Sequence, residues 1–211
     1  MKGIDKQHSG RLYLPTDEEI SSLQRSCLEK QYEFNHLPPS RSEERLALLK
    51  EMFAEFGEGS YVEPPLHCNF GGHFIHFGKN VYANFNLTCV DDTHIYVGDN
   101  TLFGPNVTIS TTGHPIQPQL RKQLYQFSRP VRIGKNVWIG AGVIILPGVT
   151  IGDHSVIGAG SLVSKDIPAN VVAYGTPARP VRPISEKDDI YYFKDDRIDW
   201  NDLIQQDQEL L

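Results

Sequence analysis

One histidine of the chain stands where it could act as a general base. His114 lies between Gly113 and Pro115, in a polar stretch that interrupts an otherwise regular sequence. Its imidazole, with an unperturbed pKa of about 6.5, can accept a proton near neutral pH. A hydroxyl group that loses its proton to such a base becomes a competent nucleophile, so acyl transfer to an alcohol is one chemistry that His114 could serve. A structural or merely exposed histidine is the alternative interpretation.

The cysteines point to no covalent chemistry. The chain has three, an odd number, and they fall in no nucleophile motif and no metal-ligand spacing: Cys27, Cys68 and Cys89. Small buried apolar side chains are the simpler interpretation, and unpaired cysteines suit a reducing cytoplasm. We therefore expect no acyl-cysteine intermediate.

A six-residue repeat must position the reactive residues. A branched aliphatic recurs at every sixth position, and its members are Ile133, Ile139, Ile145, Ile151, Ile157 and Val163. A period of six matches neither a helix nor a half-buried strand. It is typical of a solenoid of short parallel strands, in which three hexads form one triangular coil of about 18 residues and the coils stack about 4.8 Å apart. Ile133, Ile151 and Ala169 are then expected to share one inward column.

The same phase continues upstream with less regularity and is broken once. Its members there are Phe77, Ala83, Cys89, Val97, Phe103 and Ile109. The pattern then disappears over Ser110–Pro130. The sequence therefore predicts a β-helix over residues 61–184 with a loop extruded at about 110–130. Loops of this length in a compact repeat domain are usually functional or disordered, and we favour a functional loop.

The two ends of the chain differ from the repeat. In the N-terminal region, residues 1–60, Thr16-Asp17 can cap one helix, and Ser40 with Glu43 can form the capping box of a second that ends at Gly57. We expect these helices to form a hairpin that covers the open strand edge of the first coil. The tail, residues 185–211, is acidic and aromatic, and either a short helix or a loose segment fits it.

Composition limits the classes of function. The chain has 211 residues, 39% of them hydrophobic, and a formal net charge of −6, as expected of one soluble domain with appendages. It shows no apolar stretch long enough to cross a membrane and no signal peptide, so we expect a cytoplasmic protein. No stripe of lysine and arginine is visible, which argues against nucleic acid as a partner.

Several motifs together resemble the galactoside and maltose O-acetyltransferases, with a likeness to the galactoside type strengthened by Tyr191–Asp195 near the end. The motifs are Tyr32–His36, Val62–Pro65, Tyr82–Asn86, Val90–Asp92, Thr112–Pro115, Asn136–Gly140, Pro147–Gly152 and Lys165–Pro168. This resemblance implies an all-β solenoid that is a left-handed parallel β-helix, although general rules favour right-handed crossovers. It also implies a homotrimer with active sites between subunits, acetyl-CoA as co-substrate, a small sugar as acceptor and no metal.

The resemblance also assigns the catalytic residues. His114 matches the family's base, which would let a sugar hydroxyl attack the thioester directly. The resemblance implies that this is the 6-hydroxyl. Asn84 matches the residue that contacts the thioester and stabilises the tetrahedral intermediate. From the residues alone, Asn84 could instead be a corner residue of a hexad, as asparagine readily adopts turn conformations.

The remaining site residues follow in the same way. On the cofactor side, the matching residues are Ala141, Ala159, Ser164, Lys165, Arg179 and Arg182. The alanines leave room for the pantetheine arm, and the basic residues suit phosphate groups. On the acceptor side, the matching residues are Asp17, Asn69 and Asp92. Asn69 replaces a family serine, the register near Asp17 is irregular, and each acid could instead cap a helix or a turn.

Three alternatives remain at the level of sequence. The acceptor could be maltose or glucose in place of a galactoside. His76 and His94 lie 18 residues apart and could stack as two ligands of a zinc lyase of the γ-carbonic anhydrase type, with His114 as the obvious candidate for the third. A hexapeptide scaffold without catalytic activity is the last alternative, against which the presence of His114, Asn84 and Lys165 argues.

Overall fold

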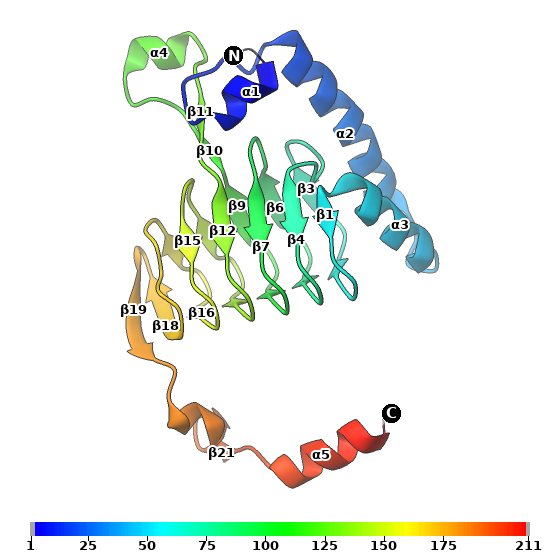
Figure 1. Ribbon diagram of the computed structural model, residues 1–211, viewed down its shortest axis with the longest axis vertical. Helices are drawn as coiled ribbons and strands as arrows, with labels where there is room; N and C mark the ends of the chain where they lie inside the picture. Colours follow the sequence, from blue (N-terminus) through cyan, green and yellow to red (C-terminus); the bar gives the residue numbers. More distant parts are fainter. Residues whose placement is uncertain (1–2, 210–211) are drawn as a thin grey trace.

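Three parallel β-sheets form the faces of a triangular solenoid in the computed structural model, which describes residues 3–209 and the side chains up to residue 204 (Figure 1). The four terminal residues of the expected N-terminal and C-terminal segments, Met1, Lys2, Leu210 and Leu211, lie outside the described residues. The parallel β-helix expected from the hexads is therefore confirmed.

Each coil contributes one strand to each face, and we call the faces first, second and third in the order in which the chain visits them. The first face contains β1 (Glu55–Phe56), β4 (Ile75–Phe77), β7 (Ile95–Val97), β12 (Val131–Ile133) and β15 (Thr150–Ile151). The second contains β2 (Tyr61–Val62), β5 (Tyr82–Ala83), β8 (Leu102–Phe103), β13 (Trp138–Ile139), β16 (Val156–Ile157), β18 (Val171–Gly175) and the antiparallel β19 (Ala178–Pro183). The third contains β3 (Leu66–Cys68), β6 (Leu87–Val90), β9 (Thr108–Ser110), β14 (Ile144–Ile145) and β17 (Leu162–Val163).

The repeated aliphatics stack in the register that the period predicts. Ile133 pairs with Ile151, and Ile139 with Ile157, one coil apart. Their side chains are buried in one continuous core, because alternate residues of each short strand point inward. The column departs from the prediction at its end. Ile151 is bridged by the buried Ile167, and Ala169 is exposed, so the last coil is two residues shorter than the repeat.

The corners of the prism require left-handed backbone angles, which asparagine tolerates better than a branched residue does. Such corners are occupied by Asn80, Asn86, Asn100, Asn106, Asn136, His154 and Asn170. Their side chains also bond from coil to coil: Asn86 Nδ2 donates to Asn106 Oδ1 at 3.1 Å. The asparagine side chains at the corners therefore add hydrogen bonds between successive coils to those of the strands.

The N-terminal region forms three helices, α1 (Gly3–His8), α2 (Glu18–His36) and α3 (Ser42–Met52). The first coil is covered by α2 and α3, whereas α1 packs on α2 and β11. The expected hairpin is formed by α2 and α3, which lie at the end of the solenoid nearest β1 (Figure 1). Asn35 of α2 both donates to the Leu66 carbonyl and accepts from the Leu66 N–H, each at 2.8 Å. The helix thus satisfies the strand edge of β3 that would otherwise pair with another molecule.

Helix α3, the second of the two helices predicted from the sequence, differs from its prediction. It begins at Ser42 after Arg41, which makes no side-chain cap, and ends at Met52, while Phe56 belongs to β1. The expected capping box of Ser40 and Glu43 and the stop at Gly57 are therefore wrong. Burial of Leu49 and Met52 against the solenoid decides the helix boundaries instead, as tertiary packing commonly does.

Two segments leave the solenoid. The extruded loop contains β10 (Thr112–Gly113), α4 (Pro118–Lys122) and β11 (Phe127–Ser128), with β10 and β11 paired as a hairpin. The C-terminal arm, residues 185–209, contains a 3-10 turn (Glu186–Asp189), β20 (Tyr191–Phe193), β21 (Asp196–Arg197) and α5 (Trp200–Glu209). Figure 1 shows the arm running below the solenoid. Among the described helices, none combines the length and the apolar character needed to span a bilayer.

The stacked core predicts a sharp contrast between neighbouring isoleucines. Ile139 is fully buried, whereas Ile144 points outward and is 44% exposed. Ile139→Ala should lower the free energy of unfolding by about 2–5 kcal/mol, because it leaves a cavity in the column. Ile144→Ala is the matched control and should cost less than about 1 kcal/mol. Denaturant unfolding measures both, and equal losses would contradict the inward assignment.

Candidate active site

The expected site residues lie on two different edges of the prism. The edge between the second and third faces carries Asn84, Ala141 and Ala159, each just after a strand of the second face. The edge between the third and first faces carries Asn69, Asp92, His114, Ser164 and Lys165, each after a strand of the third face. Arg179 and Arg182 lie on β19, beside the last coil. One chain therefore brings His114 together with the acceptor residues but not with Asn84.

His114 is held in place through its ring nitrogen Nδ1. It follows β10 in the extruded loop, and its Nδ1 lies 2.9 Å from the Tyr125 carbonyl oxygen. Because a carbonyl only accepts, the neutral ring carries its hydrogen on Nδ1 and keeps the lone pair on Nε2. The Gln126 amide nitrogen approaches that Nε2 at 3.4 Å, a long and weak contact. An exposed, correctly oriented Nε2 is what a general base requires.

Asn84 is not the corner residue of its coil. The left-handed position at this corner belongs to Asn86, with φ of 62°. The Asn84 Oδ1 accepts from the Phe85 N–H at 2.8 Å, which fixes the direction of the amide. No hydrogen bond of the Asn84 Nδ2 occurs within residues 3–209, so this donor is available to a ligand. Asn84 therefore does not hold the left-handed turn of this corner.

A tyrosine that the sequence analysis missed connects the acceptor residues. The Asp92 carboxylate is only 4% exposed and accepts from Asn69 Nδ2 at 2.9 Å and from Tyr13 Oη at 3.1 Å. Burial raises the pKa of Asp92, and burial together with Asp92 raises that of Tyr13. Tyr13 also exchanges two backbone hydrogen bonds with Gln126, which ties the extruded loop to the N-terminal segment. No spacing in the sequence relates Tyr13 to either partner.

The neighbouring acid, Asp91, has a structural task. It is fully buried and accepts from the backbone N–H groups of Phe70 and Gly72 at 2.7 and 2.9 Å. Burial raises the pKa of Asp91 to about 7, although both backbone donors act in the opposite direction. Asp91 therefore shapes the turn that presents Asn69.

Asp17 caps a helix in this structure. Its side chain accepts from the Glu19 N–H at 3.1 Å, at the start of α2. It also borders a hollow that Tyr13 and Tyr125 line, next to the carbonyl group that orients His114. Both interpretations of Asp17 thus have a structural basis.

The expected cofactor residues are divided between the two edges, and the two alanines form a strip of small residues on one of them. Ala141 and Ala159 are exposed, and the Gly160 N–H donates to the Ala141 carbonyl at 2.8 Å, so the two alanine corners stack directly. Lys165 and Arg179 are exposed as well. Arg182 differs, because its guanidinium forms two 2.7 Å bonds with the Asp188 carboxylate. That pairing lowers the pKa of Asp188 to about 2.

The predicted histidine stack exists beneath α1. His76 Nε2 lies 2.9 Å from His94 Nδ1, and the ring of His8 lies 4.9 Å from that of His94. In the part of the chain that the structure describes, no group of three or more ligands is placed to hold a metal ion. His114, the candidate third ligand, bonds to Tyr125 in the extruded loop instead. The zinc-lyase alternative therefore lacks its third ligand.

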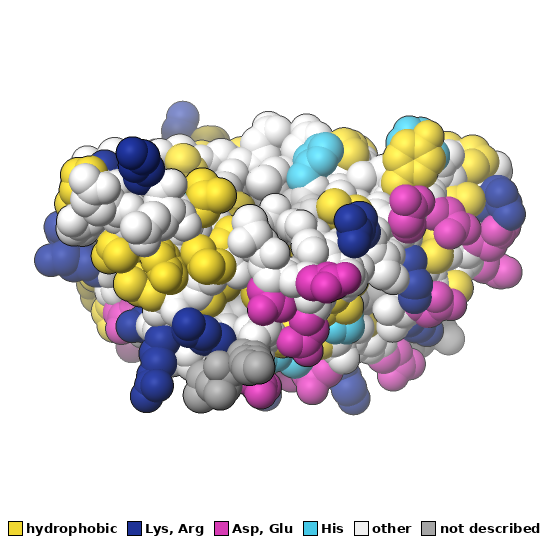
Figure 2. All heavy atoms as spheres, turned by 90° about the horizontal axis from the view of Figure 1, so that it is seen from above, with side chains coloured by type: hydrophobic (Ala, Val, Ile, Leu, Met, Phe, Trp, Pro, Cys, Tyr) yellow, Lys and Arg dark blue, Asp and Glu magenta, His cyan; other side chains and the backbone are white. Residues whose placement is uncertain are grey.

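The extruded loop exposes apolar side chains. Seen from the helical end, hydrophobic side chains gather over the extruded loop, and acidic side chains gather over the α1 and α2 region (Figure 2). The exposed apolar residues of the loop include Ile116, at 92% exposure, and Leu124, at 53%. Such a patch beside the candidate base is typical of a surface that a second molecule covers.

Comparison with known proteins agrees with this architecture. Residues 130–165 match the bacterial transferase hexapeptide family (six repeats), and residues 6–57 match the maltose acetyltransferase hexapeptide capping motif. A galactoside O-acetyltransferase of Lactococcus lactis is 48% identical over 97% of this chain and 99% of that protein. One of Escherichia coli is 51% identical over 94% of this chain and 98% of that protein.

Solved structures of acetyltransferases also share the fold of this chain. A galactoside acetyltransferase in complex with coenzyme A superposes with a TM-score of 0.92 at 51% identity, over 94% of this chain and 99% of that one. A maltose O-acetyltransferase from Clostridium difficile 630 superposes with a TM-score of 0.86 at 42% identity, over 88% of this chain and 98% of that one.

The histidine stack predicts a pH dependence of stability. Burial, followed by the nearby His94, lowers the pKa of His8 from 6.5 to about 4. Between these values the unfolded chain binds a proton that the folded chain does not, so the contribution of His8 is complete above pH 6.5 and is lost as the pH falls toward 4. Wild type should therefore lose stability relative to His8→Gln between pH 7.5 and pH 4.5.

Thermal unfolding of both proteins at the two pH values measures this difference. The comparison with the variant is needed because Asp91, whose pKa is raised, acts in the opposite direction over the same range. A difference in unfolding temperature that does not change with pH would contradict the burial of a neutral His8.

Proposed function

The chain belongs to the hexapeptide-repeat sugar O-acetyltransferase family, and on that premise we propose that it transfers an acetyl group from acetyl-CoA to the primary (6-) hydroxyl of a galactoside or related sugar. Relatives of about half identity over nearly the whole chain support the reaction. The observation that carries the proposal is His114, whose Nδ1 is fixed by Tyr125 so that Nε2 faces outward as a base.

The reaction follows from the chemistry of the two candidate residues. His114 Nε2 takes the proton of the sugar hydroxyl while its oxygen attacks the thioester carbonyl carbon. The Asn84 amide N–H donates to the oxyanion of the resulting tetrahedral intermediate, an interaction worth roughly 3–4 kcal/mol in comparable sites. Collapse of the intermediate breaks the carbon–sulfur bond, and the protonated His114 returns its proton to the CoA thiolate.

A homotrimer is part of the proposal. His114 and Asn84 of one chain lie on different edges, separated by the third face. An extended hexad spans roughly 20 Å, too far for both residues to reach one thioester. If the Asn84 edge of one copy faces the His114 edge of the next, the same contact repeats and closes around a threefold axis. The exposed apolar side chains of the loop support such a contact.

The substrates then follow the two edges. Ala141 and Ala159 leave a strip for the pantetheine arm, and Ser164, Lys165 and Arg179 are proposed contacts of the cofactor. Asn69, Asp92 and Asp17 are proposed contacts of the sugar, beside His114. Maltose or glucose is the second candidate acceptor, which the match of residues 6–57 to the maltose acetyltransferase capping motif favours. The three free cysteines support a reducing, cytoplasmic location.

Removing the base should abolish most of the activity. His114→Ala should lower turnover at least ~100-fold, because general base catalysis typically contributes 10²–10⁴. The measurement is thiol release from acetyl-CoA with a galactoside, a glucoside, maltose and an amino sugar as acceptors. The imidazole is exposed, so the unfolding temperature should stay within about 2 °C of wild type. Near-normal turnover of the folded variant would exclude His114 as the base.

A mixing experiment tests whether two copies share one site. His114→Ala and Asn84→Ala should each be nearly inactive as pure proteins. Coexpressed in equal amounts, they should recover about a quarter of wild-type activity, because that share of contacts joins an intact His114 to an intact Asn84. If both residues acted within one chain, the mixture would remain as inactive as its components.

A further inference from the structure

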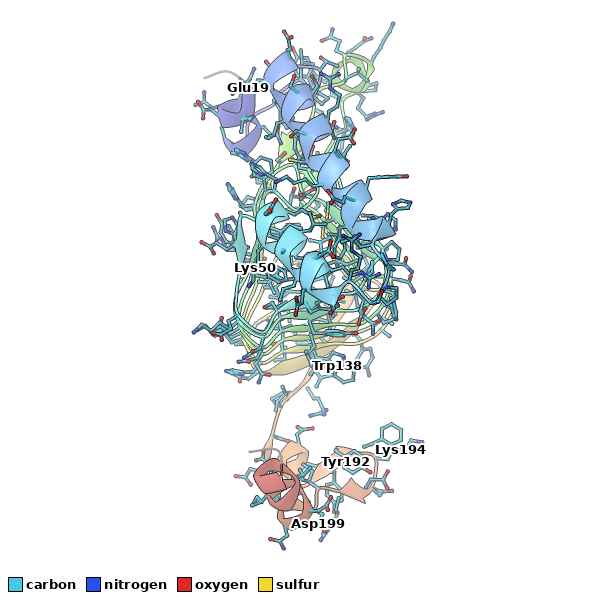
Figure 3. All side chains as sticks on the ribbon, turned by 90° about the vertical axis from the view of Figure 1, so that its right-hand side faces the viewer. Glu19, Lys50, Trp138, Tyr192, Lys194 and Asp199 are labelled. Atoms are coloured by element: carbon cyan, nitrogen blue, oxygen red, sulfur yellow. The ribbon has the colours of Figure 1, made fainter. Side chains whose placement is uncertain are left out.

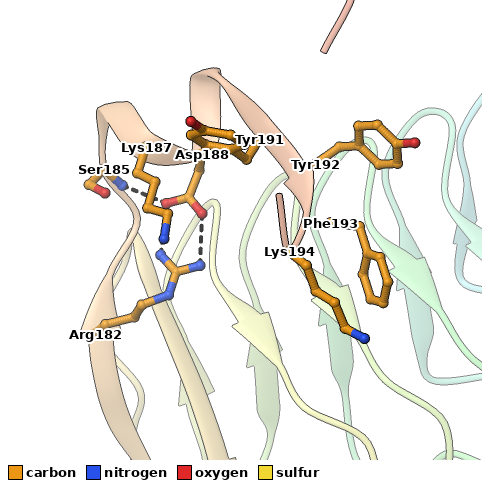
Figure 4. A pocket seen from close by; sticks show the side chains of 8 residues that line it. All are labelled: Arg182, Ser185, Lys187, Asp188, Tyr191, Tyr192, Phe193 and Lys194. Carbon is orange, nitrogen blue, oxygen red and sulfur yellow. Dashed lines mark hydrogen bonds and ion pairs between the residues drawn. The ribbon is translucent and has the colours of Figure 1, made fainter. Parts of the chain in front are cut away.

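The C-terminal arm exposes large apolar side chains. Tyr192 and Phe193 of β20 are 71% and 58% exposed, and Trp200 at the start of α5 is exposed as well. The arm is tied to the solenoid by the pair of Arg182 and Asp188, and the rings of Tyr192 and Phe193 lie across a hollow from this pair (Figure 4). Exposed apolar side chains gathered in one segment are typical of a surface that a second molecule covers.

The arm and the extruded loop carry opposite charges. Residues 185–211 contain nine Asp or Glu against three Lys or Arg, whereas residues 110–130 contain three Lys or Arg and no Asp or Glu. In the part of the chain that the structure describes, neither Lys122 of the loop nor Asp195 and Asp196 of the arm has an ion-pair partner. The loop is therefore complementary to the arm in charge, and it exposes apolar side chains of its own.

The two segments lie on opposite sides of their own chain. The loop leaves the solenoid between β9 and β12, at the edge between the third and first faces. Figure 3 looks along the stack of coils, and in it the arm lies beyond the second face, on the side on which Trp138 lies, while the green loop stands on the other side. The loop and the arm therefore do not meet within one chain.

The proposed trimer brings them together. In it, the His114 edge of one copy faces the Asn84 edge of the next, after a third of a full turn about an axis beside the third face. The Asn84 edge borders the second face. A loop that extends outward from the His114 edge thus passes over the second face of the next copy, on the side of that copy's arm (Figure 3). In Figure 1 the loop and the strands β20 and β21 are both level with the last coils, so the rotation needs no shift along the axis.

We propose that, in this trimer, the β20–β21 hairpin of one copy packs against the extruded loop of the next copy. Ile116 and Leu124 of the loop then lie against the rings of Tyr192 and Phe193, and Lys122 faces the carboxylates of the hairpin. The inference rests on the trimer of the proposed function. It gives the arm a role of its own, which is to hold the neighbouring loop, with its candidate base, over the second face.

Cross-linking with a carbodiimide tests the contact directly. The reagent joins an amine to a carboxylate that touches it, so it should link Lys122 of one chain to Asp195 or Asp196 of another. The linked species should run as dimers and trimers on a denaturing gel, and their digest should contain the joined peptides. Lys122→Arg is the matched control, because it keeps the positive charge but offers no amine to the reagent. It should abolish this peptide pair.

Charge reversal makes the result independent of the reagent. Lys122→Glu and the double substitution Asp195→Lys with Asp196→Lys should each loosen the loop, because like charges then face each other. Amide hydrogen exchange of residues 110–130 should be at least ~5-fold faster in each variant and return close to the wild-type rate when all three substitutions are combined. Lys50→Glu, at an exposed lysine of α3 away from the arm, is the control for altered net charge (Figure 3).

The outcomes separate this inference from the proposed function. A trimer that yields no peptide pair between Lys122 and the hairpin, or loop exchange that the reversals leave unchanged, would overturn the inference while acetyl transfer remains. A combined variant that exchanges as fast as the single reversals would overturn it as well. Absence of thiol release from acetyl-CoA with every acceptor, in a trimer that still forms the cross-link, would instead contradict the proposed function.

Discussion

The backbone hydrogen bonds between successive coils are the constraint on which the rest of this structure depends. They hold each strand against its copy one coil away, so every inward aliphatic meets the same neighbour at nearly the same distance. The corners are carried along with the strands. Residues that share a phase in the repeat therefore form straight columns on the edges, as Ala141 and Ala159 do. The distance between edge residues of successive coils is therefore set by the pairing of the strands.

Two parts of this solenoid need support from outside the repeat: the unpaired strand edge of the first coil and the loop extruded between β9 and β12. The N-terminal segment contacts both. Asn35 of α2 satisfies the exposed backbone of Leu66. Tyr13 supports the extruded loop, since its backbone pairs with Gln126 and its hydroxyl donates to Asp92. The loop that carries His114 is thus attached to the N-terminal segment, and Asp92 is attached through the same tyrosine. Contacts of this kind fix the position of the loop that carries His114.

The candidate site residues of one chain are divided between two edges of the prism. A prism offers three edges, and the candidate residues occupy two of them with distinct chemistry: small exposed residues and an amide on one, acids and an imidazole on the other.

Periodicity alone determined the stacked core, the faces and the place of the extruded loop, because a repeat encodes contacts between positions a constant distance apart. It could not determine features that break the repeat or cross it. The tertiary structure decided that Ile167 and not Ala169 covers Ile151, that Asn86 and not Asn84 turns the corner, and that Arg182 pairs with Asp188. The bond from Tyr13 to Asp92 joins residues 79 positions apart. Such contacts depend on where the folded chain places each segment, and no local pattern of residue types records them.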